Sequence, residues 1–467
     1  MRSLAARLLS NTRKTELLAA KQIPVFLNNR KQNGARPSEV AGRCRRVSRV
    51  GKVLCGLLLL AIPALASDAD WRQEYARRRA ALRKALPDAV VALVGGTEAE
   101  RGDLRSGFQQ ESNFYYLTGW REPGALAILT PGGDYLLLPK RSDVRERYTG
   151  KKASPEDSGI GPLTGFDHVL STDEFGPKLR ELADNRSVFT LEKVSGAEKV
   201  KEALGGKEIQ DATLAVARLR MVKSAREVEQ LQVSIDASVA AHLAAWKRMA
   251  AGLFEYQIAA TMGNTYFERG CERHAYPPIV GSGPNSIVLH YGANRRRMDQ
   301  GELLLMDVGA ECSSYAADLT RTVPVSGRFT PRQREVYDIV LGAQNAAIAA
   351  ARPGMKLTGT GAGTLNQIAL DYVNAHGKDL KGAPLGKYYL HQLGHHVGLD
   401  VHDATDGSIA LAPGMVVTIE PGLYIAEENI GIRIEDMILI TENGAKLLSG
   451  ALPREAGDIE KALKRRK

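Results

Sequence analysis

The sequence predicts an α/β domain followed by an α+β domain, and three observations lead to this prediction. The chain has 467 residues, which is enough for two or three domains with large cores. Short apolar runs alternate with helical stretches as far as about residue 215, a pattern typical of α/β domains. A long helical pattern then precedes two β-rich blocks, residues 302–325 and 415–441, which further helical stretches separate.

Four parts follow along the chain: a basic leader with a signal peptide (1–66), the α/β domain (67–217), the α+β domain (218–452) and a charged tail (453–467). In the first domain, charged amphipathic or helical patterns predict helices at residues 67–86 and 173–184. Short apolar runs predict strands at residues 89–94, 125–129 and 135–138. In the second, good helix formers predict helices at residues 224–251, 331–351 and 364–375.

The net charge of +10 is concentrated in the leader. Residues 1–66 carry 13 of the 63 basic residues and 2 of the 53 acidic ones, so the remaining chain, with 50 against 51, is close to neutral. A nucleic-acid partner needs a basic patch, often with interleaved aromatic residues. The body of the protein offers only short basic runs, so we expect no nucleic-acid partner.

An apolar run of 14 residues, 53–66, follows a basic stretch and ends in Ala-Leu-Ala, as secretory signal peptides do. A membrane-spanning helix needs about 20 apolar residues, so we expect export, to the periplasm or outside the cell, without a stable membrane anchor. The rival interpretation is a mitochondrial presequence, because residues 1–14 are Arg-rich and lack acidic residues. Cleavage of the leader on export would remove two of the four cysteines and leave Cys271 and Cys312. These two could form one disulfide, although their spacing does not show that they meet.

Asp307 and Asp318 lie in two apolar or alternating runs of the first β-rich block. A two-residue hairpin turn at about Cys312-Ser313 would place their carboxylates directly opposite each other. Like charges at facing positions repel, and burial of two unpaired carboxylates costs still more. A cation bound between the two carboxylates would offset both their repulsion and the cost of burying them. The alternative is that one aspartate is solvated at a turn or pairs with Arg321.

The second β-rich block repeats the arrangement with Glu420 and Glu435 at the ends of two apolar stretches. Arg433 could satisfy Glu435 through a salt bridge, but four carboxylates in apolar strands are hard to explain without metal. Thr320 and Thr418 could hydrogen-bond these carboxylates, or could be ordinary strand threonines.

Four histidines lie between the two blocks, within HQLGHHVGLDVHD: His391, His395, His396 and His402. Imidazole is both a metal ligand and a proton carrier near neutral pH. Four carboxylates and one imidazole make an oxygen-rich set that suits two divalent ions, with manganese, cobalt or zinc as candidates. Such a pair activates water and stabilises the oxyanion of an attacked carbonyl.

The ligand order resembles that of the pita-bread (creatinase/methionine-aminopeptidase) metallopeptidases, and within them of aminopeptidase P and prolidase. By this resemblance residues 218–452 form an α+β pita-bread catalytic domain. Asp307 would bind one metal, His395 and Glu420 mainly the other, and Asp318 and Glu435 would bridge both. The upstream stretch FQQESNFYYLTGWREPGALAIL resembles the N-terminal domain of aminopeptidase P, which methionine aminopeptidase lacks.

The resemblance also implies roles for residues outside the ligand set. Glu420 would act as general base. His290 and His402 match the family's substrate-binding and proton-transferring histidines, and His391 matches a histidine of the proline pocket. Tyr276 and Arg433 lie where the family has groups near the substrate and the bridging ligand, whereas His396 matches no such role.

The activity implied is metal-dependent removal of the first residue from Xaa-Pro-Yaa peptides, with Mn²⁺ the expected ion. The alternatives are a prolidase that cleaves Xaa-Pro dipeptides and a non-catalytic pita-bread module that binds peptides. A homo-oligomer, dimer or tetramer, is a further expectation. The chain has Tyr115 where some aminopeptidases P have a tryptophan that reaches a neighbouring subunit's site, which leaves that contact open.

Overall fold

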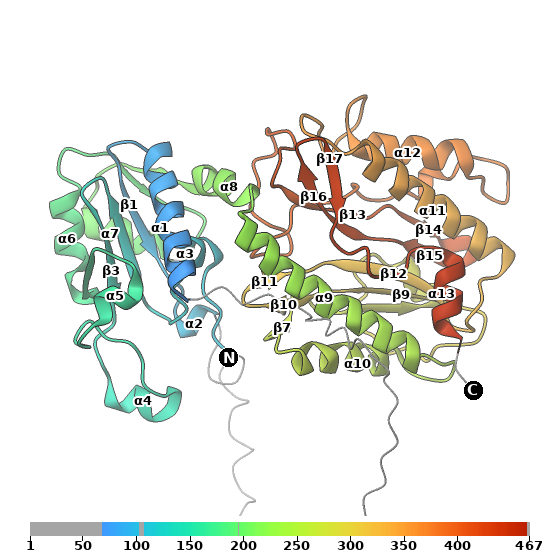
Figure 1. Ribbon diagram of the computed structural model, residues 1–467, viewed down its shortest axis with the longest axis horizontal. Helices are drawn as coiled ribbons and strands as arrows, with labels where there is room; N and C mark the ends of the chain where they lie inside the picture. The colour runs from blue at the N-terminus through green and yellow to red at the C-terminus, as the bar shows by residue number, and fades with distance from the viewer. Residues whose placement is uncertain (1–67, 102–106, 195, 465–467) are drawn as a thin grey trace, which may run out of the picture. The chain divides into compact units, whose positions relative to one another are not determined.

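The computed structural model describes residues 68–101, 107–194 and 196–464 (Figure 1). The predicted leader and export signal, residues 1–66, lie outside these residues. Over the part of the chain so described, no helix has the length and apolar character needed to cross a membrane.

The first domain is built on a six-stranded mixed sheet with the order β4-β3-β2-β1-β5-β6. Antiparallel pairing joins β1, β2 and β3, and parallel pairing joins the other neighbours. The strands are β1 (Val90–Val94), β2 (Leu126–Thr130), β3 (Gly133–Leu138), β4 (His168–Ser171), β5 (Val188–Thr190) and β6 (Ile209–Asp211).

Helices cover both faces of this sheet, which explains why its central strands are apolar throughout. Along β1, Val91 and Leu93 join one buried cluster and Val90 and Ala92 the other, as the alternation of a strand requires. The helices are α1 (Asp68–Ala85), α2 (Glu98–Arg101), α3 (Ser112–Thr118), α4 (Asp143–Thr149), α5 (Ile160–Thr164), α6 (Phe175–Leu182), α7 (Ala197–Leu204) and α8 (Thr213–Met221), with the 3₁₀ turn η1 (Thr172–Glu174).

The second domain begins with the long helix that the sequence predicts. Ser224 caps α9 (Ala225–Arg248), and Glu227 closes a capping box with it. The other helices are α10 (Glu255–Glu268), α11 (Pro331–Ala350), α12 (Leu365–His376) and α13 (Ala456–Leu463), with the 3₁₀ turns η2 (Gly283–Ile287), η3 (Leu385–Tyr388) and η4 (Ala426–Glu428).

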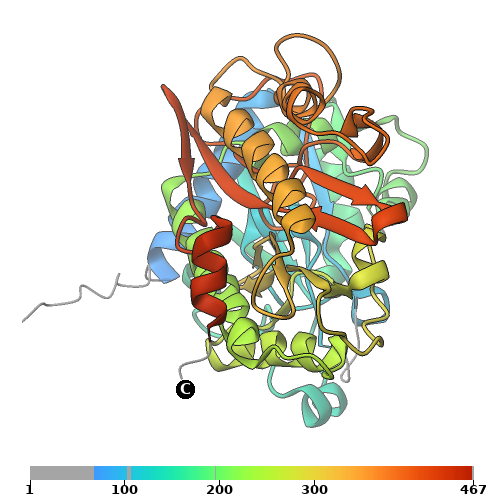
Figure 2. The same ribbon diagram turned by 90° about the vertical axis from the view of Figure 1, so that its right-hand side faces the viewer.

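The two β-rich blocks form the strands between these helices. The first block and its neighbours supply β7 (Arg273–His274), β8 (Ile279–Ser282), β9 (Leu303–Val308), β10 (Ala310–Cys312), β11 (Tyr315–Ala316) and β12 (Leu319–Pro324). The second supplies β13 (Val416–Ile419), β14 (Gly422–Ile425), β15 (Ile430–Arg433), β16 (Asp436–Thr441) and β17 (Gly444–Leu447). Helices α9 and α10 pack on strands of the first block, whereas α11, with α12 beside it, packs on the second (Figures 1 and 2).

The hairpin that carries the two aspartates has a different register from the predicted one. Asp307 faces Thr320 rather than Asp318. The turn lies one residue later than expected, because Cys312 pairs with Tyr315. The expectation of facing carboxylates is therefore wrong.

The turn itself explains the shift. Ser313 and Ser314 both have positive φ, 51° and 70°, as a two-residue hairpin of type I′ requires. Glycine and asparagine usually signal such a turn, and serine does not. Continuing the register places Asp318 opposite Gly309, where a Cβ would lie 1.7 Å from Ala317 O. Asp307 and Asp318 are thus diagonal neighbours on one face of the hairpin.

The second block has a register that brings its two glutamates face to face. Ile419 pairs with Asp436 in β13 and β16, and Gly422 pairs with Arg433 in β14 and β15. Glu420 and Glu435 occupy the facing positions in the gap between these two ladders.

Two further features hold the second domain together. Cys271 and Cys312 form a disulfide between the segment before β7 and the end of β10. In α13, Ala456 and Ile459 are completely buried and Glu460 accepts a hydrogen bond from the Phe329 N–H, so packed structure extends into the predicted charged tail.

Candidate metal centre

Three predicted ligands converge on one point between the two blocks. Carboxylate oxygens of Asp318 and Glu435 and a ring nitrogen of His395 all lie within 4.8 Å of one another. His395 Nε2 is also 3.5 Å from Glu420 Oε1 and 3.4 Å from Asp318 Oδ2. The fold thus brings Asp318 next to Glu435, which is more than a hundred residues later in the chain.

Asp307 adjoins this group and has partners within the protein. Arg433 Nη2 donates to Asp307 Oδ2, and the Tyr276 hydroxyl lies 2.6 Å from Asp307 Oδ1 and also contacts Asp318. Burial opposes ionisation of Asp307, but Arg433 and Tyr276 outweigh it and hold the pKa of this carboxyl below its ordinary value. The sequence-based alternative, in which Arg433 pairs with Glu435, does not match these contacts.

The other three carboxyls are in the opposite electrostatic situation. Burial raises the pKa of Asp318, Glu420 and Glu435 well above the ordinary range, and repulsion from neighbouring carboxylates raises it further. Arg321, the other partner considered for the aspartates, pairs instead with Asp436 at 2.8 Å. Buried oxygen donors that repel one another and lack a cation of their own suit divalent ions.

His395 is oriented as a ligand by its main chain. Its Nδ1 lies 3.1 Å from His396 O, so the ring proton sits there and the Nε2 lone pair faces the carboxylates. Its backbone N–H donates to Thr418 Oγ1 at 3.0 Å. Gly394 lets the two segments approach, because a Cβ there would lie 2.2 Å from Thr418 O.

Both threonines singled out in the sequence hydrogen-bond glutamates of the site. Thr320 Oγ1 donates to Glu435 Oε2 at 2.7 Å, and Thr418 Oγ1 donates to Glu420 Oε1 at 3.3 Å. Each therefore helps to orient a carboxylate of the candidate centre.

Tyr424 is a contact that sequence reasoning missed. Its hydroxyl accepts from Arg433 Nη1 at 2.6 Å and lies 2.8 Å from His391 Nε2, while His391 Nδ1 is 2.8 Å from Gln392 O. Arg433 thereby connects Asp307 to His391. Burial lowers the pKa of His391 to about 4, so the ring is neutral at pH 7. A tyrosine in an apolar strand gives no sequence signal for this role.

The remaining histidines divide into an exposed pair and a buried one. The rings of His402 and His395 have centroids 4.1 Å apart, and partial burial lowers the pKa of His402. His290, like His402, is exposed. His396 is buried, which lowers its pKa to about 4, and its carbonyl oxygen lies 3.1 Å from His395 Nδ1.

Tyr115, the residue at which the chain departs from some aminopeptidases P, lies inside the first domain. Its side chain is 5% exposed. Arg121 Nη2 donates to its hydroxyl at 2.8 Å, and the Tyr75 hydroxyl is 3.1 Å from it.

Comparisons with known proteins agree with both domains. Residues 229–442 match the model of metallopeptidase family M24, and residues 75–191 match that of the aminopeptidase P N-terminal domain. The chain is 33% identical to the Xaa-Pro aminopeptidase of Escherichia coli strain K12, over 83% of this chain and 97% of the relative. It is 35% identical to the Xaa-Pro dipeptidase of Pyrococcus furiosus, over 72% and 90%. The solved structure of aminopeptidase PepP from Pseudomonas aeruginosa superimposes with a TM-score of 0.76 at 29% identity, covering 84% of this chain and 98% of that one.

Proposed function

This chain belongs to the M24 metallopeptidases, among their Xaa-Pro aminopeptidases, and we propose that it binds two divalent ions, Mn²⁺ by preference, to perform the reaction of that group. The reaction is removal of the N-terminal residue from peptides with proline at position two. The observation that carries the proposal is the convergence of Asp318, His395 and Glu435 between two hairpins, with Glu420 and Asp307 beside them.

The residues that would hold the ions are Asp307, Asp318, His395, Glu420 and Glu435. Bound there, divalent ions lower the pKa of water and stabilise negative charge on the attacked carbonyl oxygen. The donor set fits this role, because three of its carboxyls have their pKa raised by burial and mutual repulsion and gain most from a cation.

Proton transfer falls to Glu420 and the histidines. Glu420 keeps 16% of its side chain exposed, so it can face a water molecule and accept its proton. The proline nitrogen must be protonated as it leaves, and we assign that proton to Glu420, relayed through His402. His290, on the exposed side, would hydrogen-bond the carbonyl of the first residue, with His391 and Tyr424 bordering the proline pocket.

One assay tests the activity and separates it from the prolidase alternative, which the similarity to a dipeptidase supports. The purified protein with Mn²⁺ is given Ala-Pro-Ala and Ala-Pro, and product alanine is measured before and after a chelator. We expect cleavage of the tripeptide in preference to the dipeptide and loss of both activities with the chelator. Faster cleavage of Ala-Pro would overturn the aminopeptidase assignment, and activity that survives metal removal would overturn the metal centre.

We further propose that the protein is exported, with a mitochondrial destination as the alternative. Disulfides persist mainly in oxidising compartments, so the Cys271–Cys312 bond supports export. Fractionation of the source cells, with N-terminal sequencing of the mature chain, tests this. A mature chain beginning near residue 67 outside the cytoplasm is the expected result.

A further inference from the structure

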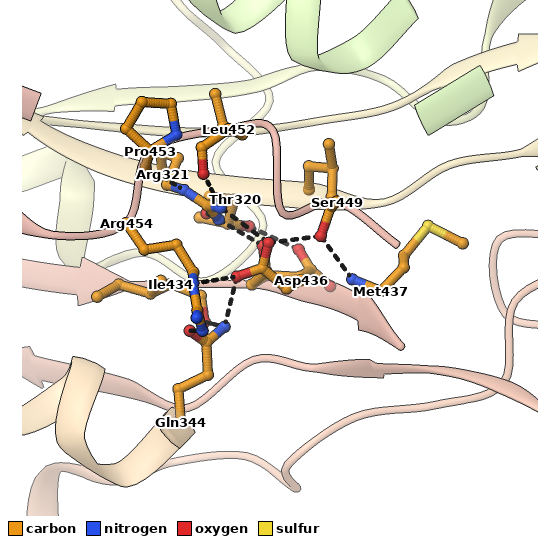
Figure 3. Close-up of polar contacts among 12 residues, drawn as sticks. Thr320, Arg321, Gln344, Ile434, Asp436, Met437, Ser449, Leu452, Pro453 and Arg454 are labelled. Atoms are coloured by element: carbon orange, nitrogen blue, oxygen red, sulfur yellow. Dashed lines mark hydrogen bonds and ion pairs between the residues drawn. The ribbon is translucent and has the colours of Figure 1, made fainter. Parts of the chain in front are cut away.

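A buried glutamine on α11 lies directly behind the two glutamates of the candidate metal centre. Gln344 Nε2 is 3.0 Å from Ile419 O and 3.0 Å from Ile434 O. These carbonyls belong to the residues immediately before Glu420 and Glu435. Gln344 has no exposed surface, and Figure 3 shows it below the main chain at Ile434.

The glutamine replaces a strand hydrogen bond that a proline removes. The register of the second block sets Pro421 opposite Ile434, and the Ile434 N–H donates to Pro421 O at 3.4 Å. A hydrogen-bonded antiparallel pair exchanges two such bonds, but proline has no N–H to give back. Ile434 O is therefore left without its ladder donor, and Gln344 donates to it instead.

The ion pair between Arg321 and Asp436 holds the main chain at Glu435, on the side opposite to Gln344. Arg321 donates to Glu435 O at 2.6 Å and to Thr320 O at 2.9 Å, and pairs with Asp436 Oδ1 (Figure 3). Gln344 Nε2 also lies 3.1 Å from Asp436 Oδ2. Arg321 and Asp436 are completely buried. The main chain at Glu435 is thus fixed on both sides, by Gln344 at the preceding carbonyl and by Arg321 at its own.

We propose that Gln344 is a positioning residue for the metal centre: its side-chain amide closes the gap in the ladder at Pro421 and so fixes the separation of Glu420 and Glu435. Two carboxylates that face each other across an unpaired stretch would otherwise move apart under their own repulsion. The role of Gln344 is then to set metal affinity, without any contact with metal or substrate. This inference rests on the metal site proposed above.

The test is Co²⁺ binding by the full chain. Metal-free wild type and Gln344→Met are titrated with Co²⁺, and the visible absorption of the bound ion is followed. Methionine keeps the volume of the side chain but removes the amide. We expect the dissociation constant to rise by about 10–100-fold, as for loss of other groups that orient metal ligands, with altered absorption bands.

Gln333 provides a matched control on the same helix. It is also a buried glutamine that donates to a main-chain carbonyl, Gly301 O at 2.8 Å, but it lies away from the site. Gln333→Met should lose stability comparably and leave Co²⁺ affinity and spectrum unchanged. Gln344→Asn, with an amide one methylene shorter, should give an intermediate affinity and serves as the test if Gln344→Met does not fold.

A rescue experiment addresses the mechanism directly. In Gln344→Met/Pro421→Ala the main chain regains an N–H opposite Ile434 O, so part of the lost Co²⁺ affinity should return. Equal affinity of wild type and Gln344→Met, equal weakening in Gln333→Met, or no recovery in the double variant would each overturn the role of Gln344. A wild-type chain that binds no divalent ion would instead refute the proposed function.

Discussion

Arg433 divides the four carboxylates of the site into two electrostatic classes. It pairs with Asp307, whose pKa it lowers, while Asp318, Glu420 and Glu435 have pKa values raised by burial. The same guanidinium reaches Tyr424, which orients His391. One side chain therefore links the charge state of a candidate ligand to the position of a candidate substrate-binding histidine.

Replacement of Glu420 tests its assignment as the general base. Glu420→Gln keeps the shape of the side chain but cannot accept a proton, so kcat for Ala-Pro-Ala should fall by about 10²–10⁴-fold. His395→Ala should also lose most activity, through loss of metal. The exposed Glu427 offers a control, and Glu427→Gln should retain wild-type kcat. Near-normal turnover in Glu420→Gln and His395→Ala would contradict the mechanism.

The raised pKa values predict a pH dependence of metal binding. A carboxyl whose pKa is raised on folding lowers the stability of the metal-free protein as pH rises above its unfolded pKa of about 4, because the unfolded chain then releases a proton that the buried carboxyl still holds. Metal ions relieve this cost only when the carboxyls are ionised. The increase in Tm caused by Mn²⁺ should therefore be larger at pH 8 than at pH 5, as thermal unfolding with and without the ion would show. An increase that is the same at both pH values would contradict the assignment of these groups.

At the scale of elements, the sequence pattern predicts the strands and helices well but not how the strands pair. The apolar runs of β9, β13 and β16 are visible in the sequence because these strands are buried along most of their length. β12 is also buried, but it has three polar residues in its middle. Register depends on the turn, and Ser313-Ser314 adopts positive φ without the residue types that usually indicate it. The donors of the candidate site could be listed from the sequence, whereas Tyr424 and Gln344 could not. Tyr424 lies in an apolar strand where a tyrosine carries no signal of its contacts, and Gln344 comes from a remote helix.

The disulfide should stabilise the hairpin element. It closes a loop with a sequence separation of 41 residues, for which restriction of the unfolded chain contributes roughly 4 kcal/mol. We expect Cys271→Ser/Cys312→Ser to lower the free energy of unfolding by about 2–4 kcal/mol in urea titrations. The wild type with a reducing agent should behave like the variant. Coincident transitions of oxidised wild type and variant would show that the bond contributes nothing.

At the scale of the whole molecule, a buried ion network connects the first domain to the loop that carries His395 and His402. Arg220, on α8, donates to Asp400 at 2.8 Å and pairs with Asp403. Asp403 also forms an ion pair with Lys223 at 2.9 Å. Asn113, on α3, accepts from Arg220 at 2.7 Å. Burial opposes ionisation of Asp403, but Arg220 and Lys223 outweigh it and bring its pKa to about 2. The first domain thus supports the chain segment next to the site.

Removal of Arg220 should therefore destabilise the molecule as a whole. Arg220→Met leaves a buried carboxylate with one partner fewer and should cost about 3–5 kcal/mol of unfolding free energy. Arg218 lies on the same helix and pairs with Asp406, but its side chain is 57% exposed, so Arg218→Met should cost at most about 1 kcal/mol. Urea unfolding measures both. Equal midpoints for the two variants would contradict this account of the network.

The two-residue turn at Ser313-Ser314 has a consequence for how this protein can evolve. Insertion or deletion of one residue in the loop would move Asp318 to the other face of its strand relative to Asp307. In addition, Gly309 leaves no space for a side chain near Ala317. The turn residues can change to others that accept positive φ, but the number of residues between the two aspartates cannot change. Insertions and deletions in descendants of this gene should therefore accumulate in other loops and be absent between residues 309 and 318.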